Sequence, residues 1–259
     1  MILKYSLGAV ITIPLLPLLY LQGRRVKKSI PDLPEAKEPS GVSGFSECPK
    51  MKILIIGEST MAGVGVENHR DGFAGTLADE LANKLKSCVH WTVHAKSGIT
   101  VGRMSEELLI QIEDNDWDLV VVGIGGNDAF KLNNPIRWKS QIREFINQLN
   151  CRFPQVPIVF TNMPPIKEFP AFTPLMKWTI GNLVELLGEA LDDVVGEFNQ
   201  VYYSSEVISI ENWVKEYNLS SDISLYFSDG VHPSQLTYQT LAKQLVEFIG
   251  SDVNLEQNL

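Results

Sequence analysis

Short aliphatic and β-branched runs alternate with longer amphipathic stretches from residue 51 onwards. The short runs predict strands at 52–57, 90–94, 119–124, 158–162 and 201–204. The longer stretches predict helices at 75–86, 101–113, 135–151, 175–198 and 233–248. A run that is apolar throughout, such as residues 53–56, is typical of a strand covered on both faces. The alternation therefore predicts an α/β fold with a doubly wound parallel sheet.

A long uncharged stretch precedes this alternating region. Residues 5–23 carry no charge and are rich in leucine, isoleucine and valine. As a helix, they would span roughly the 30 Å hydrocarbon core of a bilayer. Bulky residues follow where a signal-peptide cleavage site needs small ones, so residues 1–23 are predicted to be an uncleaved membrane anchor, with a cleaved signal peptide as the alternative. Pro14 and Pro17 would kink a spanning helix, so a helix that lies in the membrane interface is a further alternative.

Basic residues follow the predicted anchor. Four of them stand just after it, whereas only Lys4 and the amino terminus precede it. The positive-inside tendency then places the following domain on the cytoplasmic face, with export to the periplasm or the outside as the alternative. Residues 24–50, basic and then rich in proline, are expected to form an extended tether. One folded domain is expected at 51–250 and a tail at 251–259.

Charge is unevenly distributed along the chain. The 259 residues include 22 basic and 31 acidic side chains, a net charge of −9. Residues 1–30 hold five of the basic side chains and no acidic one, so the rest of the chain carries −14. An acidic surface repels phosphate backbones, which excludes a general nucleic-acid binder. The basic leader is the part expected to meet a membrane, and the sequence indicates no oligomeric state.

A serine follows the first predicted strand. Reactive groups of doubly wound sheets gather at the carboxyl ends of the strands, and Ser59 stands at such an end after Gly57 and Glu58. A phosphate-binding loop is excluded, because it would need Gly and Lys where the chain has Ala62 and Gly63. Two interpretations of Ser59 remain, a nucleophile that faces the crevice and a helix N-cap.

Two further segments carry candidate chemistry. Asp229 and His232 lie three residues apart on a turn-rich loop before the last predicted helix. A nucleophilic serine needs an imidazole to accept its proton and a carboxylate to orient that imidazole, and one short loop can supply both. Asn127 follows Gly125 and Gly126 at the end of the third predicted strand, where a side-chain amide can stabilise an oxyanion. Simple turns at both places are the alternative.

Four short segments resemble, in order and spacing, the four sequence blocks of the SGNH (GDSL-type) serine hydrolase family: Gly57-Glu58-Ser59, Gly98, Gly125-Gly126-Asn127-Asp128 and Asp229-Gly230-Val231-His232. The resemblance covers residues 51–250 and implies a catalytic domain there. The fold it implies is a flavodoxin-like three-layer α/β/α sandwich with a five-stranded parallel sheet. Glu58 departs from the family pattern, in which Asp is usual at this position.

The resemblance also implies the roles of the site residues. Ser59 would be the nucleophile, His232 the general base and acid, and Asp229 its orienting carboxylate. The oxyanion hole would consist of the backbone N–H groups of Ser59 and Gly98 and the side-chain amide of Asn127.

The implied activity is hydrolysis of carboxylic esters, either of the lipid or lysophospholipid type or with short acyl groups, through an acyl-enzyme on the serine. No cofactor or metal is expected. Alternatives with the same triad are a carbohydrate O-acetylesterase and an acyltransferase. A non-enzymatic alternative is a lipid- or glycan-binding module.

The sequence also gives expectations for the other histidines and for one aromatic segment. His90 and His94 would lie roughly 13 Å apart on a strand, too far to share one zinc ion. His69, in a polar loop, is expected to be solvated. The apolar stretch at 169–178 either packs in the core or forms a wall for an acyl chain.

Overall fold

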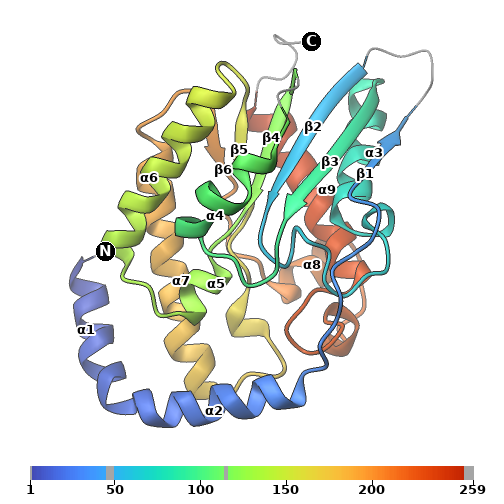
Figure 1. The fold of residues 1–259 in the computed structure, drawn as a ribbon. Coiled ribbons are helices and arrows are strands. Elements are labelled where there is room, and N and C mark those ends of the chain that lie inside the picture. The colour runs from blue at the N-terminus through green and yellow to red at the C-terminus, as the bar shows by residue number, and fades with distance from the viewer. Residues whose placement is uncertain (1, 45–49, 114–115, 254–259) are drawn as a thin grey trace.

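A six-stranded sheet forms the centre of the computed structural model, which describes residues 2–44, 50–113 and 116–253 (Figure 1). The strands follow the order β1-β3-β2-β4-β5-β6 across the sheet. Their bounds are β1 (Ser40–Ser43), β2 (Lys50–Gly57), β3 (Cys88–Ala95), β4 (Leu119–Gly123), β5 (Ile158–Phe160) and β6 (Val201–Tyr203). Strands β2 to β6 are parallel to their neighbours, so the doubly wound parallel sheet is confirmed, with all five predicted strands in place.

The sixth strand, β1, comes from the segment predicted to be an extended tether. It pairs antiparallel with β3 at the edge of the sheet. Several backbone hydrogen bonds hold the residues before it, among them Val93 N to the Pro39 carbonyl at 2.7 Å and Lys37 N to the Glu67 carbonyl at 2.9 Å. This part of the predicted extended tether at 24–50 is thus not separate from the domain, because backbone pairing fixes it to the sheet. Residues 45–49 of the predicted tether lie outside the described residues.

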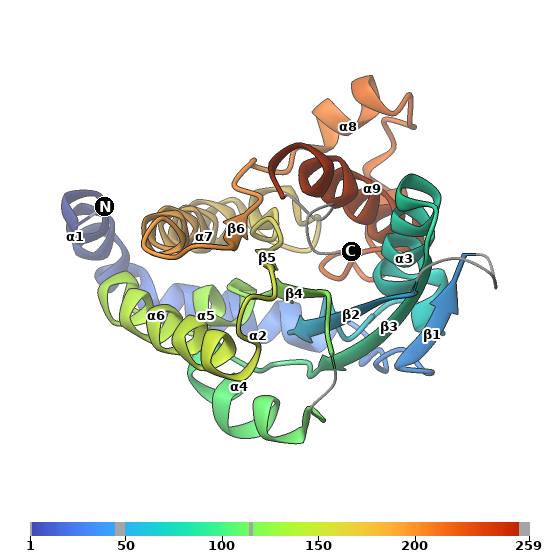
Figure 2. The ribbon, with the colours of Figure 1, turned by 90° about the horizontal axis from the view of Figure 1, so that it is seen from above.

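Helices cover both faces of the sheet (Figure 2). Leu54 and Ile56 of β2 pack in one core with the helices that follow β3, β4 and β5, whereas Ile53 and Ile55 pack in a second core with the helix that follows β2 and the last helix of the chain. All four side chains are fully buried, which explains why β2 is apolar throughout. The α-helices after β2 are α3 (Phe73–Leu85), α4 (Val101–Glu107), α5 (Gly126–Phe130), α6 (Pro135–Arg152), α7 (Pro174–Val195), α8 (Ile210–Glu216) and α9 (Gln235–Asp252).

The predicted helices correspond to α3, α4, α6, α7 and α9, with shifts at their ends. The predicted helix at 101–113 ends earlier as α4, and a short 3₁₀ helix follows it. Helix α9 passes the predicted domain end at residue 250, and residues 254–259 of the predicted tail lie outside the described residues. The 3₁₀ helices are η1 (Ile13–Leu15), η2 (His69–Asp71), η3 (Leu109–Gln111), η4 (Ile166–Glu168) and η5 (Ile223–Tyr226).

The N-terminal segment forms two helices, α1 (Ile2–Thr12) and α2 (Leu16–Ser29), joined by η1. The chain changes direction between them, where Pro14 and Pro17 stand, and α2 runs across the end of the molecule toward which the arrow of β3 points (Figure 1). Lys4 forms an ion pair with Glu189 of α7 at 2.5 Å. The stretch Ile2–Ser29 is long and apolar enough to cross a membrane, which suits either an anchor or a signal sequence.

The sheet order locates the crevice in which a site is expected. The chain passes from β2 to β3 on one side of β2, and it returns to add β4 on the other side. The carboxyl end of β2 is therefore a topological switch point, where ligands of open α/β sheets bind.

Candidate active site

Ser59 lies directly beyond the carboxyl end of β2, at this switch point. The backbone of β2 runs close to that of β4 here, since Glu58 N donates to the Gly123 carbonyl at 3.0 Å. A Cβ atom at Gly57 would lie 2.4 Å from the same carbonyl oxygen, so only glycine fits at that position. The glycine before Glu58 thus allows the chain to turn and present the serine.

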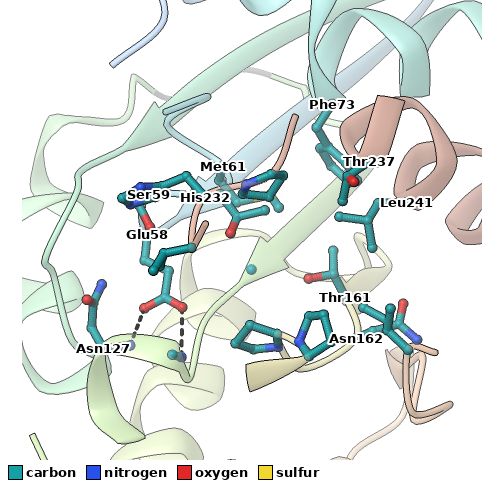
Figure 3. Close-up of a pocket in the computed structure, with 18 of the residues that line it drawn as sticks. Glu58, Ser59, Met61, Phe73, Asn127, Thr161, Asn162, His232, Thr237 and Leu241 are labelled. Carbon is teal, nitrogen blue, oxygen red and sulfur yellow. Dashed lines mark hydrogen bonds between the residues drawn. The ribbon is translucent and has the colours of Figure 1, made fainter. Parts of the chain in front are cut away.

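Asn127 lies in the first turn of α5, beyond the end of β4. The helix starts after Gly125, whose φ of 112° is a conformation that favours glycine. The buried carboxylate of Glu58 accepts the backbone N–H groups of Gly126 at 2.7 Å and Asn127 at 2.9 Å (Figure 3). Two adjacent strand ends are therefore joined by one side chain, and the Asn127 amide is positioned through it.

The carboxyl group of Glu58 is buried. Burial raises its pKa from the ordinary value of 4.5 to about 7, and the N–H groups of Asn127 and Gly126 oppose that rise. The nearby charge of Asp128 raises the pKa further. Near neutral pH, Glu58 therefore exists as a mixture of the acid and the carboxylate.

Asp229 and His232 form a pair on the loop before α9. Asp229 Oδ2 lies 2.6 Å from His232 Nδ1. Its other oxygen accepts the backbone N–H groups of Val231 at 2.9 Å and His232 at 2.7 Å. The Asp229 side chain is fully buried, whereas that of His232 is 23% exposed. A carboxylate at Nδ1 favours the tautomer with the proton on Nδ1, which leaves Nε2 free to accept a proton.

A single cavity of about 210 Å³ is lined by Ser59, Gly98, Asn127 and His232. Ser59 and His232 lie at the same end of it in Figure 3, with no hydrogen bond between them. Three polar donors that line the cavity are unpaired within the described part of the chain: the backbone N–H groups of Ser59 and Gly98, and the buried Asn127 Nδ2. The predicted site residues are thus brought together from four segments far apart in the sequence.

Two features of the site were not predicted from the sequence. Asp128 is fully buried and accepts the backbone N–H of Val101 at 3.1 Å and the Asn133 amide at 2.7 Å, which ties α5 to α4. Glu35, from the segment before β1, accepts the backbone N–H of Ser97 at 2.6 Å, next to Gly98. No sequence pattern predicts either contact, because each joins segments that only the fold brings together.

The structure also shows the burial and contacts of the other histidines and of the aromatic segment considered in the sequence. His69 is 4% exposed, so the prediction that it is solvated was wrong. Burial lowers its pKa to about 4, so it is neutral at physiological pH. Phe169 lines the cavity with Ser59, and its ring contacts those of Phe172 and Phe227 edge-on. His94 lies on β3, and burial lowers its pKa.

Comparison with known proteins decides the family. Residues 55–240 match the model of the GDSL-like Lipase/Acylhydrolase family. The chain belongs to this family. The resemblance seen in the four sequence blocks is thereby confirmed, and the GDSL-type chain is an enzyme of the esterase and lipase class. No curated protein sequence matches it.

Solved structures share the fold of this GDSL-type enzyme. A protein from Parabacteroides merdae described as a GDSL-like lipase has a TM-score of 0.61 and 18% identity, over 80% of this chain and 99% of its own. A family 3 carbohydrate esterase from Clostridium thermocellum has a TM-score of 0.57 and 17% identity, over 81% and 98%. An extracellular lipase from Streptomyces rimosus has a TM-score of 0.53 and 15% identity, over 76% and 99%.

Proposed function

We propose that this GDSL-type enzyme hydrolyses carboxylic esters through a covalent acyl-enzyme on Ser59. The observation that carries the proposal is the single cavity that Ser59 shares with His232 and three unpaired N–H donors. A hydroxyl is a weak nucleophile until an adjacent base removes its proton, and His232 is the base that lines the same cavity.

The reaction has two steps. His232 Nε2 takes the proton of Ser59 as Oγ attacks the ester carbonyl, and Asp229 stabilises the resulting imidazolium through Nδ1. When the tetrahedral intermediate collapses, the alcohol leaves with the proton from His232. Water then attacks the acyl-enzyme with His232 again as base, and the carboxylic acid is released with Ser59 restored.

The oxyanion is the charge that this site must stabilise. The N–H groups of Ser59 and Gly98 and the amide of Asn127 donate no hydrogen bond of normal geometry within the described part of the chain. Preorganised donors of this kind are worth several kcal/mol in a transition state. We assign these three groups to the oxyanion hole.

The substrate is an ester of the lipid or lysophospholipid type, or one with a short acyl group. A carbohydrate ester is the second candidate, because a carbohydrate esterase is among the proteins that share the fold. Transfer of the acyl group to an acceptor other than water would use the same triad. Product analysis with and without an alcohol or sugar acceptor distinguishes transfer from hydrolysis.

The N-terminal segment is proposed to attach this catalytic domain to a membrane, uncleaved and on the cytoplasmic side. The bend at η1 and the ion pair between Lys4 and Glu189 favour helices that lie in the interface over a straight span. The basic residues of α2 suit an anionic membrane surface. Intact mass of the purified protein tests whether the segment is retained.

Replacing the nucleophile tests the function. Ser59→Ala should reduce hydrolysis of p-nitrophenyl butyrate to the background rate, because no hydroxyl remains to be acylated. Ser205→Ala, a change of the same kind at an exposed serine outside the cavity, should keep the wild-type rate. Wild-type turnover in S59A, with the circular dichroism of the native fold, would contradict the assignment of Ser59.

A further inference from the structure

A large groove lies between α2 and the carboxyl edge of the sheet. Its volume is about 1070 Å³. One wall is built from α2 and the residues after it, and the opposite wall includes Phe172, Met176 and Ile180 from the start of α7 and the segment before it. A hydrogen bond from Thr173 Oγ1 to Gln22 Oε1, 2.6 Å long, joins the two walls.

The groove is continuous with the catalytic cavity. Ser97, Phe130, Val231 and His232 line both. His232 therefore stands where the two spaces meet. A molecule that reacts at Ser59 can extend past His232 into the groove without leaving the protein surface.

The two volumes differ in what they can hold. Pockets that bury most of a drug-sized ligand measure about 300–1,000 Å³. The catalytic cavity, at about 210 Å³, is smaller than that range, whereas the groove, at about 1070 Å³, reaches its upper end. The cavity alone suits the reacting ester group and a short chain, so a longer alkyl chain needs the groove.

One face of α2 lines the groove with apolar and small residues. Leu16, Leu19, Gly23 and Val26 are spaced by three or four positions, so they lie on one face of the helix. Leu19 is buried and joins the same core as Phe172 and Met176. A Cβ atom added to Gly23 would meet no atom within 4 Å, so the groove is open beside it.

We propose that this groove binds the long alkyl chain of an amphiphilic ester, with α2 as one wall of the substrate site. The N-terminal segment then acts in substrate selection as well as in membrane attachment. The inference rests on the proposed function of Ser59 and specifies its substrate: an ester whose chain is too long for the catalytic cavity alone. Arg24, Lys27 and Asp32 also line the groove, but most of its lining residues are apolar, and this favours a hydrocarbon chain over a sugar.

Filling the groove at Gly23 tests this inference. The full-length chain is placed in vesicles of a dialkyl-ether phosphatidylcholine, which the enzyme cannot hydrolyse, and kcat/KM is measured for p-nitrophenyl butyrate and p-nitrophenyl dodecanoate. In Gly23→Trp, kcat/KM for the dodecanoate ester divided by kcat/KM for the butyrate ester should fall at least tenfold, because the indole occupies the space of several methylene groups. Gly8→Trp is the matched control. Gly8 also has open space beside it, but it lies on α1 away from the groove, so the wild-type ratio should be kept.

A binding measurement separates failure of the inference from failure of the proposed function. Displacement of a fluorescent hydrophobic probe by dodecanoate needs no turnover. Dodecanoate should displace the probe saturably from wild type and G8W, and at least tenfold more weakly from G23W. Equal displacement from all three proteins, or equal ester ratios in all three, would overturn the groove as the chain site even if butyrate is hydrolysed. Absence of all hydrolysis, with weakened binding in G23W alone, would instead refute the proposed function and leave the groove as a chain-binding site.

Discussion

The side chain of Asn127 departs from the rule that buried polar groups are paired. Its buried side-chain nitrogen has no hydrogen bond of normal geometry, although the amide lies close enough to Glu58 to lower the pKa of that carboxyl, whereas its backbone N–H is held by Glu58. An orphaned buried donor costs folding free energy, so its retention beside Ser59 is explained if an acceptor arrives with the substrate. The developing oxyanion is such an acceptor.

Removing this donor should therefore affect catalysis far more than stability. In Asn127→Ala, kcat for ester hydrolysis should fall about 100- to 1,000-fold, which corresponds to about 2.7–4 kcal/mol of transition-state stabilisation. The melting temperature should not fall, because alanine keeps the backbone bond to Glu58 and removes an unpaired group. Asn182→Ala, on α7 and outside the cavity, is the control. A loss of less than threefold in kcat would remove Asn127 from the oxyanion hole.

At this scale the sequence predicts which residues meet, but not how they are held. Ser59, Asn127 and His232 follow strand ends or precede the last helix, so the topology alone brings them to one edge. The role of the Glu58 carboxylate could not be predicted in this way. The sequence shows only that it departs from the family pattern, whereas its bonds to the next strand end and its raised pKa depend on burial that only the fold creates.

Among the elements, the link from β2 to α5 through Glu58 has a measurable effect on stability. Between pH 4.5 and 7 the folded protein keeps a proton on Glu58 that the unfolded chain releases, because burial raises the pKa to about 7. The folded state therefore binds more protons in this window, and the free energy of unfolding falls as pH rises through it. The expected loss is about 3 kcal/mol.

Urea unfolding of the full chain at pH 5 and pH 7.5 measures this effect. In Glu58→Gln the group cannot ionise, so this variant should lose about 2 kcal/mol less than wild type between pH 5 and pH 7.5, the part of the full effect that falls within this interval. Glu38→Gln, at an exposed position, should show the wild-type dependence on pH. Parallel behaviour of wild type and E58Q would mean that Glu58 has no raised pKa in the folded protein.

Two elements, β1 and α5, could not be predicted from hydrophobic periodicity. The five parallel strands carry their own aliphatic runs and were predicted. In contrast, β1 has the sequence Ser-Gly-Val-Ser, which has little strand preference and becomes a strand only through its pairing with β3. Helix α5 has five residues, too few for a hydrophobic period, and its start depends on the positive φ of Gly125.

At the scale of the whole molecule, the N-terminal helices present a large apolar surface to the outside. Leu3 and Val10 share one face of α1 and are 83% and 70% exposed. Soluble surfaces rarely gather such residues, and a lipid interface would cover them. The sequence could not show where these helices lie, because an apolar helix that crosses a membrane and one that packs along α7 have the same composition.

Acidic substitutions on this face test the membrane proposal. The double variant Leu3→Glu, Val10→Glu should bind vesicles of anionic phospholipid at least tenfold more weakly than wild type, because two charges replace buried apolar contacts with the bilayer. Val207→Glu places a charge at an equally exposed valine outside the N-terminal helices and should bind like wild type. Sedimentation with vesicles gives the bound fraction. Unchanged sedimentation of the double variant would rule out this face as the membrane contact.

The acyl-enzyme on Ser59 is the central claim, and mass spectrometry of protein quenched during turnover tests it most directly. With p-nitrophenyl butyrate as substrate, a fraction of the intact protein should gain the mass of one butyryl group, and peptide sequencing should place that group on Ser59. S59A should gain no mass under the same conditions. A butyryl group on another residue, or hydrolysis at the wild-type rate by S59A, would contradict the account.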